Sequence, residues 1–332
     1  MDKIDVEIEK IGLYNVEVIR NGEKRFSIST SNFWIPTLKN DRIPVTNFTR
    51  ILQNPIDVSC YPDDIFEDSG KGEKLESILQ YIMYQMNPNE TNLYEKIKAR
   101  FVTNRGLLTN ISMRNKSIQY KVVRRKSVYF LFSNEQSTSP STSRYQNLIT
   151  SIKLGKYLTD DRNPQMNTGF MTKSVNRLIF PAGITILTSA EIDYQRENGQ
   201  IVEGKCLLNK THNHYEEYFR KSVLQSHFGN VDEILVGRKK EVETNYYSGK
   251  QYFVYQIEST SRKKFLTFQT APDIINDGNL RLFNTLVAIQ KYLTKDDTAL
   301  EITKHHDDSV NFREISPDLC DFVPYDFYSR FQ

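Results

Sequence analysis

Residues 183–208 read GITILTSAEIDYQRENGQIVEGKCLL, and this stretch decides which fold the sequence predicts. Two runs rich in β-branched and apolar residues, 183–194 and 201–208, lie on either side of a polar segment around Glu197–Gly199. Strand-forming runs separated by a short polar segment with glycine are typical of a β-hairpin. We therefore expect two neighbouring strands joined by a turn.

The two expected strands carry an unusual set of charged residues. Side chains alternate between the faces of a strand, so Glu191 and Asp193 share one face of the first strand. By the same rule, Glu203 and Lys205 share one face of the second. Carboxylate oxygens suit Mg²⁺ or Mn²⁺, which can offset charge on a phosphate and activate a water for phosphodiester hydrolysis. The alternative is an exposed hairpin face whose surface ion pairs contribute little.

The rest of the chain predicts a mixed α/β protein with central mixed β-sheets flanked by helices. Asp, a spacer and Glu-x-Lys form the PD-(D/E)XK nuclease pattern, so we expect that kind of core. A Ser/Thr/Pro-rich loop at Ser133–Ser143 is a weak candidate for a boundary, and we expect a single domain over 1–332. The apolar periodicity predicts helices over 73–86, 145–154, 213–228 and 279–293, hairpins at 118–132 and around Ser248–Gly249, and strands at 233–237, 299–303 and 310–315.

Composition narrows the class of protein. The chain of 332 residues is long enough to bury a core, and its net charge of +3 does not by itself indicate a nucleic-acid binder. Its three cysteines form neither a zinc pattern nor a disulfide framework. No run approaches the roughly 18 apolar residues of a membrane span, and the charged N-terminus has no secretory h-region. We expect an intracellular protein with no membrane partner.

Five separated segments, in the same order, resemble the DXO/Rai family of RNA decapping nucleases. The resemblance extends from residue 9 to about residue 240, which is most of the chain. It includes an Arg-Gly pair after a strand, an acid pair two residues apart, Glu-x-Lys, and a helix that carries a glutamine. The segments are Glu9–Tyr14, Phe101–Gly106, Ala190–Asp193, Val202–Cys206 and Phe219–Gln225.

The resemblance implies a role for each matching residue. Glu191, Asp193 and Glu203 would bind a divalent metal, Mg²⁺ or Mn²⁺, together with the backbone carbonyl of Gly204. Lys205 and Gln225 would contact the scissile phosphate or the attacking water. Arg105 would hold an RNA phosphate, which suits a planar guanidinium with a permanent charge.

Two positions depart from the family pattern. The family has a further glutamate at the start of a helix, and the best match here is Gln146, which keeps an oxygen but loses a charge. Weaker metal binding, or loss of a second metal, would follow. Gly204 stands where the family has a bulky apolar residue, which loosens a strand but leaves the backbone carbonyl.

We therefore expect a metal-dependent hydrolase acting on RNA 5′ ends in the nucleus or cytoplasm. By resemblance, it would remove incomplete or NAD caps, hydrolyse 5′-triphosphates, or degrade RNA from the 5′ end. One alternative is an attenuated relative that binds RNA ends or a partner exoribonuclease. Another is a PD-(D/E)XK nuclease acting on DNA.

Overall fold

The computed structural model describes residues 3–331, except 22, 34, 62–72, 86, 88, 134–141, 160–169, 209–211, 243–250, 268 and 269. It is a mixed α/β structure with two β-sheets, and each sheet contains both parallel and antiparallel strand pairs. The predicted fold class is confirmed.

The larger sheet has nine strands, in the order β14-β13-β5-β6-β4-β8-β7-β1-β2. Its central strand β4 runs parallel to both of its neighbours, β6 and β8, while the other pairs are antiparallel. The strands are β1 (Glu7–Asn21), β2 (Glu23–Ser29), β4 (Phe101–Asn104), β5 (Ile118–Arg125), β6 (Val128–Phe132), β7 (Phe170–Ile179), β8 (Thr185–Glu191), β13 (Thr298–Lys304) and β14 (Val310–Ile315).

The smaller sheet has five strands, in the order β3-β12-β11-β10-β9. Strands β10 and β11 are parallel, and the short strand β9 pairs antiparallel with the start of β10. The strands are β3 (Thr49–Asp57), β9 (Tyr194–Gln195), β10 (Ile201–Leu208), β11 (Glu233–Val242) and β12 (Gln251–Ser261).

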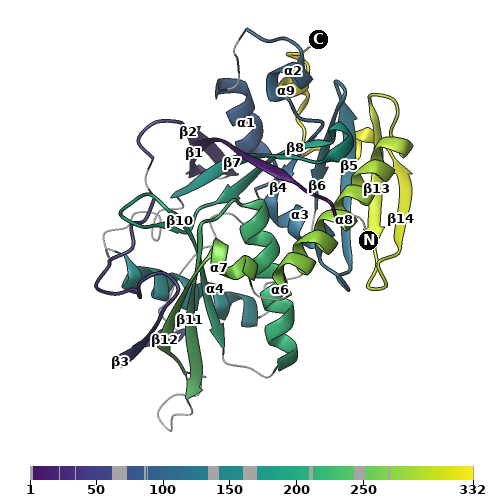
Figure 1. Cartoon of the computed structure of the whole chain (residues 1–332). Coiled ribbons are helices and arrows are strands. Elements are labelled where there is room, and N and C mark those ends of the chain that lie inside the picture. Colours follow the sequence, from purple (N-terminus) through teal and green to yellow (C-terminus); the bar gives the residue numbers. More distant parts are fainter. Residues whose placement is uncertain are drawn as a thin grey trace.

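Helices cover both faces of the larger sheet. On one face α3, α6 and α8 pack on one another and on the sheet, and their apolar cluster also takes in Ile234 of the smaller sheet. Figure 1 shows α6 and α7 between the larger sheet and the β11–β12 pair. On the other face lie α1, α2 and α9. Helix α4 packs against the smaller sheet. The helices are α1 (Glu76–Gln85), α2 (Leu93–Ile97), α3 (Arg105–Ser112), α4 (Thr142–Leu158), α6 (His212–Phe228), α7 (Arg262–Thr267), α8 (Ala271–Tyr292) and α9 (Tyr325–Tyr328).

The two sheets are joined directly by residues between β8 and β9. Ile192 and Ile201 are buried together with Ile35 and Val231 in a small apolar cluster at this junction. The chain therefore passes from one sheet to the other just where the acidic residues lie, and the burial of Ile192 fixes the path of this segment.

Most of the predicted elements are present, and several are longer than expected. The predicted helices over 73–86, 145–154, 213–228 and 279–293 correspond to α1, α4, α6 and α8. The predicted hairpin over 118–132 is the β5–β6 pair. Of the predicted Ser133–Ser143 loop, residues 134–141 lie outside the described residues, and so do Ser248 and Gly249.

Among the described helices, none combines the length and the apolar character that a membrane span requires.

Candidate active site

Glu203 lies at the centre of a buried group of charged residues. Its side chain, on β10, is only 2% exposed. The Nη1 atom of Arg105 donates to its Oε2 at 2.7 Å, and the Nζ atom of Lys205 donates to its Oε1 at 2.6 Å. Lys205 lies two residues further along the same strand, as the alternation of side chains predicted. Both carboxylate oxygens of Glu203 are therefore held by cationic groups.

These neighbours keep the Glu203 carboxylate ionised. Burial alone would raise its pKa, but the charges and hydrogen bonds of Arg105 and Lys205 lower the pKa of Glu203 to about 2. Burial likewise disfavours the charged form of Arg105, yet Glu203, with Asp193 and Glu191, raises the pKa of this guanidinium. Each charge is thus stabilised by its opposite.

Asp193 lies in the junction between the two sheets and is half-buried. Its Oδ2 atom accepts a hydrogen bond from the backbone N–H of Gly204 at 2.8 Å, which fixes it beside β10. Burial, followed by the charge of Glu203, raises the pKa of Asp193 to about 7. Lys205 opposes this shift and Glu191 adds to it. Burial and the neighbouring carboxylates therefore both disfavour the ionised form of Asp193.

Glu191 is the last residue of β8 and reaches the same group from the larger sheet. It is exposed, and its charge acts on the pKa values of both Asp193 and Arg105. The structure therefore brings five predicted site residues into one electrostatic group: Arg105, Glu191, Asp193, Glu203 and Lys205. Two strands of different sheets, β8 and β10, supply Glu191 and the Glu203–Lys205 pair.

The predicted hairpin between 183–194 and 201–208 is present only next to its turn, where β9 pairs with the start of β10, and the predicted pairing along β8 is wrong. Strand β8 pairs with β7 along one edge and with β4 along the other, so no edge is left for β10. Only the two-residue strand β9 pairs with β10. Asp193 lies beyond the end of β8, so the rule of alternating faces does not place it. Glu191, Asp193 and Glu203 lie near one another because the chain passes from the larger sheet to the smaller sheet between β8 and β9.

Gly204 has a packing role that the sequence did not indicate. A Cβ atom at this position would lie 2.3 Å from Cε2 of Tyr194, so the tyrosine ring occupies the space that a side chain would need. Tyr194 is buried in the apolar cluster of the smaller sheet. The glycine therefore lets β9 lie tightly against β10 beside Asp193.

Gln225 lies in α6, half-buried, near the end of the helix. The backbone N–H of Gly229 donates to the carbonyl of Gln225, and a Cβ atom on Gly229 would lie 3.3 Å from Nη1 of Arg105. The end of α6 is therefore packed against Arg105. Within the described residues, no hydrogen bond joins the Gln225 side chain to the acidic group.

Gln146 lies near the start of α4 and is half-buried. This helix packs against β10, but the contacts recorded beside Gln146 are those of Thr150 and Asn147 with the Nζ atom of Lys239, at 3.0 and 3.4 Å. In the part of the chain that the structure describes, no hydrogen bond connects Gln146 with Glu203 or Asp193. A place for Gln146 in the site stays a prediction.

The donors fit a divalent metal by their chemistry. Oxygen-only carboxylate groups suit a hard cation, and the pKa of Asp193 is raised by burial and then by the charge of Glu203, both of which a bound cation would offset. As the side chains stand, however, no three His, Cys, Asp or Glu residues among those described are arranged to hold one ion. Ligation by Glu191, Asp193, Glu203 and the carbonyl of Gly204 stays a prediction.

A second buried polar group adjoins the first, and the sequence analysis missed it. Tyr14, Lys173 and Glu191 are paired across β1, β7 and β8. Lys173 donates to Glu73 at 2.5 Å, Ser77 also donates to Glu73, and the hydroxyl of Tyr14 lies 3.0 Å from that of Ser77. The only signal in the sequence is Lys173, in the middle of the strand-forming run FMTKSVNRLI at 170–179. This group links α1 to the strand beside Glu191.

No protein-family model matches the sequence, and no curated protein matches it. Solved structures do match its fold. Rai1 of Scheffersomyces stipitis, in complex with (3′-NADP)⁺ and calcium, is 14% identical with a TM-score of 0.69 over 99% of this chain and 96% of that one. Rai1 of Candida albicans, with pU5 and Mn²⁺, is 14% identical with a TM-score of 0.67 over 98% and 95%. Dxo1 of K. lactis, with manganese, is 12% identical with a TM-score of 0.60 over 96% and 93%.

These matches extend over nearly the whole of each chain, so the protein has the fold of the Rai1 and Dxo1 structures. The predicted resemblance to the DXO/Rai family is confirmed at the level of the fold.

Proposed function

We propose that this protein is a metal-dependent phosphoester hydrolase that acts on the 5′ ends of RNA. The observation that carries this proposal is the meeting of Asp193, Glu203, Lys205 and Arg105 at one place, in a chain with the fold of Rai1 and Dxo1. Carboxylates beside two cationic donors match the needs of phosphoryl chemistry, in which a metal and fixed positive charges offset the charge of the phosphate.

The ligands of the structural neighbours favour nucleotides as substrates. The S. stipitis protein is in complex with (3′-NADP)⁺, the C. albicans protein with pU5, and one S. pombe Rai1 structure with 3′-FADP. We extend this chemistry to RNA with incomplete or NAD caps and to RNA 5′-triphosphates, with 5′-to-3′ degradation as a further activity. Such substrates would place the protein in the nucleus or cytoplasm.

Each residue of the group would have a distinct task. Glu191, Asp193, Glu203 and the carbonyl of Gly204 would hold Mg²⁺ or Mn²⁺, which neutralises phosphate charge and lowers the pKa of a bound water. Arg105 presents a planar fork of donors that can hold two phosphate oxygens at once. The ammonium group of Lys205 would add a second positive charge to that of Arg105. The amide of Gln225, at the end of α6 next to Arg105, would orient the phosphate or the water.

The proposal is tested with purified protein and 5′-labelled RNAs bearing different ends, in Mg²⁺ or Mn²⁺. We expect metal-dependent release of 5′ products, and we expect Asp193→Asn and Glu203→Gln each to lower kcat by about 100-fold or more. Glu197→Gln is the matched control, because Glu197 is an exposed acid in the β9–β10 turn whose side chain forms a hydrogen bond only with Asn40 among the described residues. Full activity in Asp193→Asn would contradict the assignment.

A second readout does not depend on turnover. A ligand that binds the folded chain alone stabilises it by about 2.7 kcal/mol at 100 times its Kd. Mn²⁺ should therefore raise the Tm of the wild type and of Glu197→Gln, and should raise that of Asp193→Asn much less. Equal shifts in all three proteins would place the bound metal elsewhere.

A second candidate function is a non-catalytic RNA-end binder, which could also bind a partner exoribonuclease. Two observations favour it: Gln146 in place of an acid, and the pairing of both Glu203 oxygens with cations. A binder would shift capped RNA in a gel and release nothing. If Gln146→Glu then creates or raises metal-dependent release, the protein is an attenuated enzyme, whereas an inactive Gln146→Glu protein that still binds RNA would support the binder.

A further inference from the structure

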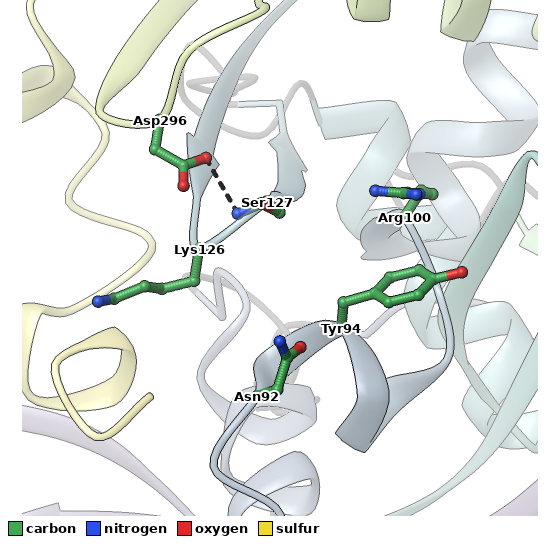
Figure 2. A pocket seen from close by; sticks show the side chains of 6 residues that line it. All are labelled: Asn92, Tyr94, Arg100, Lys126, Ser127 and Asp296. Atoms are coloured by element: carbon green, nitrogen blue, oxygen red, sulfur yellow. Dashed lines mark hydrogen bonds between the residues drawn. The ribbon is translucent and has the colours of Figure 1, made fainter. Parts of the chain in front are cut away.

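A polar cavity of 390 Å³ lies away from the candidate active site. Figure 2 shows Tyr94 and Arg100 on one side of it and Lys126, Ser127 and Asp296 on the other, with Asn92 below them in this view and the amino group of Lys126 turned away from Arg100. The lining comes from α2, from the turn between β5 and β6, and from the segment before β13. Its size is that of a small-ligand site.

The cavity and the candidate active site lie at opposite ends of β4. Arg100 directly precedes the strand, and Arg105 directly follows it. At a rise of about 3.3 Å per residue, the two arginines are roughly 16 Å apart along the chain direction. A ligand in the cavity would therefore not occupy the catalytic group.

Arg100 is held in place without an acidic partner. Its backbone N–H donates to the carbonyl of Thr185 at 3.0 Å, and its carbonyl accepts from the N–H of Tyr129 at 2.8 Å. Its guanidinium lies over the ring of Tyr94, 4.4 Å from the centroid. No ion pair joins Arg100 to any described residue. Because one face rests on the ring, the N–H groups at the edge stay available to a ligand.

Lys126 adds a second positive charge, and no ion pair joins it to the described residues either. The carboxylate in the lining, Asp296, already interacts with two neighbouring residues. Asp296 accepts from the N–H of Ser127 at 3.0 Å and pairs with Nε of Arg124 at 3.0 Å. Both contacts use the Oδ1 atom of Asp296, and among the described residues no ion pair joins this carboxylate to Arg100 or Lys126.

The uncommitted polar groups are mostly donors. The side-chain oxygen of Asn92 accepts from the N–H of Glu95 at 3.1 Å, so its NH₂ group is the part left for a ligand. Arg100 and Lys126 are donors only. A ligand that offers several acceptor oxygens and a negative charge satisfies all three, and a phosphate group is such a ligand.

We propose that this cavity binds a phosphate group, with Arg100 as a bidentate donor and Asn92 as a further donor, and with the flexible side chain of Lys126 turning toward the bound phosphate as a third donor. The phosphate belongs either to a free phosphate compound or to the backbone of an RNA chain. This site goes beyond the proposed hydrolase and does not depend on it, because none of its residues belongs to the catalytic group.

The test is calorimetric titration of the full chain in EDTA, with pyrophosphate and separately with a 5′-hydroxyl oligoribonucleotide at fixed salt. We expect Arg100→Gln to weaken binding by about tenfold or more and Lys126→Gln by about threefold. Lys295→Gln is the matched control, since Lys295 is an exposed lysine beside Asp296 that does not line the cavity. It should bind as the wild type does. Lys205→Gln measures any contribution from the candidate active site.

Weaker pyrophosphate binding in Arg100→Gln and Lys126→Gln identifies a free phosphate compound as the ligand. An effect on the oligoribonucleotide alone identifies the RNA backbone. If both variants bind both ligands as tightly as the wild type, the proposal is overturned. Thermal melting checks the fold of Arg100→Gln, and if that protein is unfolded, the surface variant Lys126→Gln decides the outcome.

Discussion

At the scale of single residues, Glu203 shows how a buried charge is kept. A carboxylate that is 2% exposed would be costly without partners, and here two cations donate to its two oxygens. Sequence reasoning found Lys205 from the alternation of strand side chains. It identified Arg105 only through a resemblance, because nothing local connects residues 105 and 203.

Gly204 supports a prediction about packing. We expect Gly204→Ala to destabilise the protein by about 1–3 kcal/mol, because the new Cβ atom would meet the ring of Tyr194. Tyr194→Leu should relieve the clash, so a double-mutant cycle by urea unfolding should give a coupling of about 0.5–3 kcal/mol. Gly106→Ala is the control, since nothing lies within 4 Å of a Cβ atom there. Additive effects at 194 and 204 would contradict this packing.

His227 predicts a pH dependence of stability. It is 8% exposed, and burial together with the charge of Arg262 lowers its pKa to about 4, although Asn279 opposes the shift. Between pH 6.5 and about 4, the unfolded chain binds this proton and the folded chain does not, so stability is lost as the pH falls through this window. The loss attributable to His227 is of the order of 3 kcal/mol.

The measurement is the free energy of unfolding against pH for the wild type and for His227→Asn. The difference between the two proteins isolates His227 from groups such as Asp193, whose raised pKa acts in the opposite direction over an overlapping window. We expect the difference to shrink as the pH falls from 6.5 to 4. A constant difference would show that His227 has an ordinary pKa.

At the scale of elements, β8 explains where sequence reasoning succeeded and where it failed. The apolar run of β8 correctly predicted a strand, and the β5–β6 hairpin was predicted because its alternation and turn are local. The hairpin between β8 and β10 was wrong because β7 and β4 occupy both edges of β8. Pairing depends on which distant strands compete for an edge, and a local pattern does not contain that information.

The buried Lys173–Glu73 pair joins β7 to the segment just before α1, where Glu73 also accepts from Ser77 of α1, and it supports a prediction at this scale. The two side chains are 8% and 5% exposed. Burial alone would lower the pKa of Lys173, but Glu73, Tyr14 and Glu191 raise it. We expect Lys173→Met to destabilise the protein by about 3–5 kcal/mol, because Glu73 then stays buried without its partner.

The double variant Lys173→Met, Glu73→Gln should recover much of this loss, as measured by urea unfolding. Arg220→Met is the control, because its i,i+4 pair with Glu216 is on the surface and should contribute less than about 1 kcal/mol. A loss at Lys173 as small as that at Arg220 would show that the pair does not hold α1 against the sheet.

At the scale of the whole molecule, we propose that 1–332 form a single domain. One apolar cluster contains residues of both sheets and of α3, α6 and α8. A second cluster buries Ile192 where the chain passes from the larger sheet to the smaller one. We expect one cooperative unfolding transition in calorimetry, with equal calorimetric and van't Hoff enthalpies. Two separate transitions, one for each sheet, would contradict a single domain.

The sequence by itself determined the mixed α/β class, most of the helices and strands, and the set of acids that meet beside Lys205. These follow from periodicity, turn residues and charge spacing, which act over a few residues. The tertiary structure alone decided that Asp193 lies in a junction between sheets, that Arg105 pairs with Glu203, and that Lys173 lies beside Glu191. The physical reason is that burial and strand pairing depend on contacts between different segments of the chain, as between Arg105 and Glu203, and a charged group stays buried only if another segment supplies its partner.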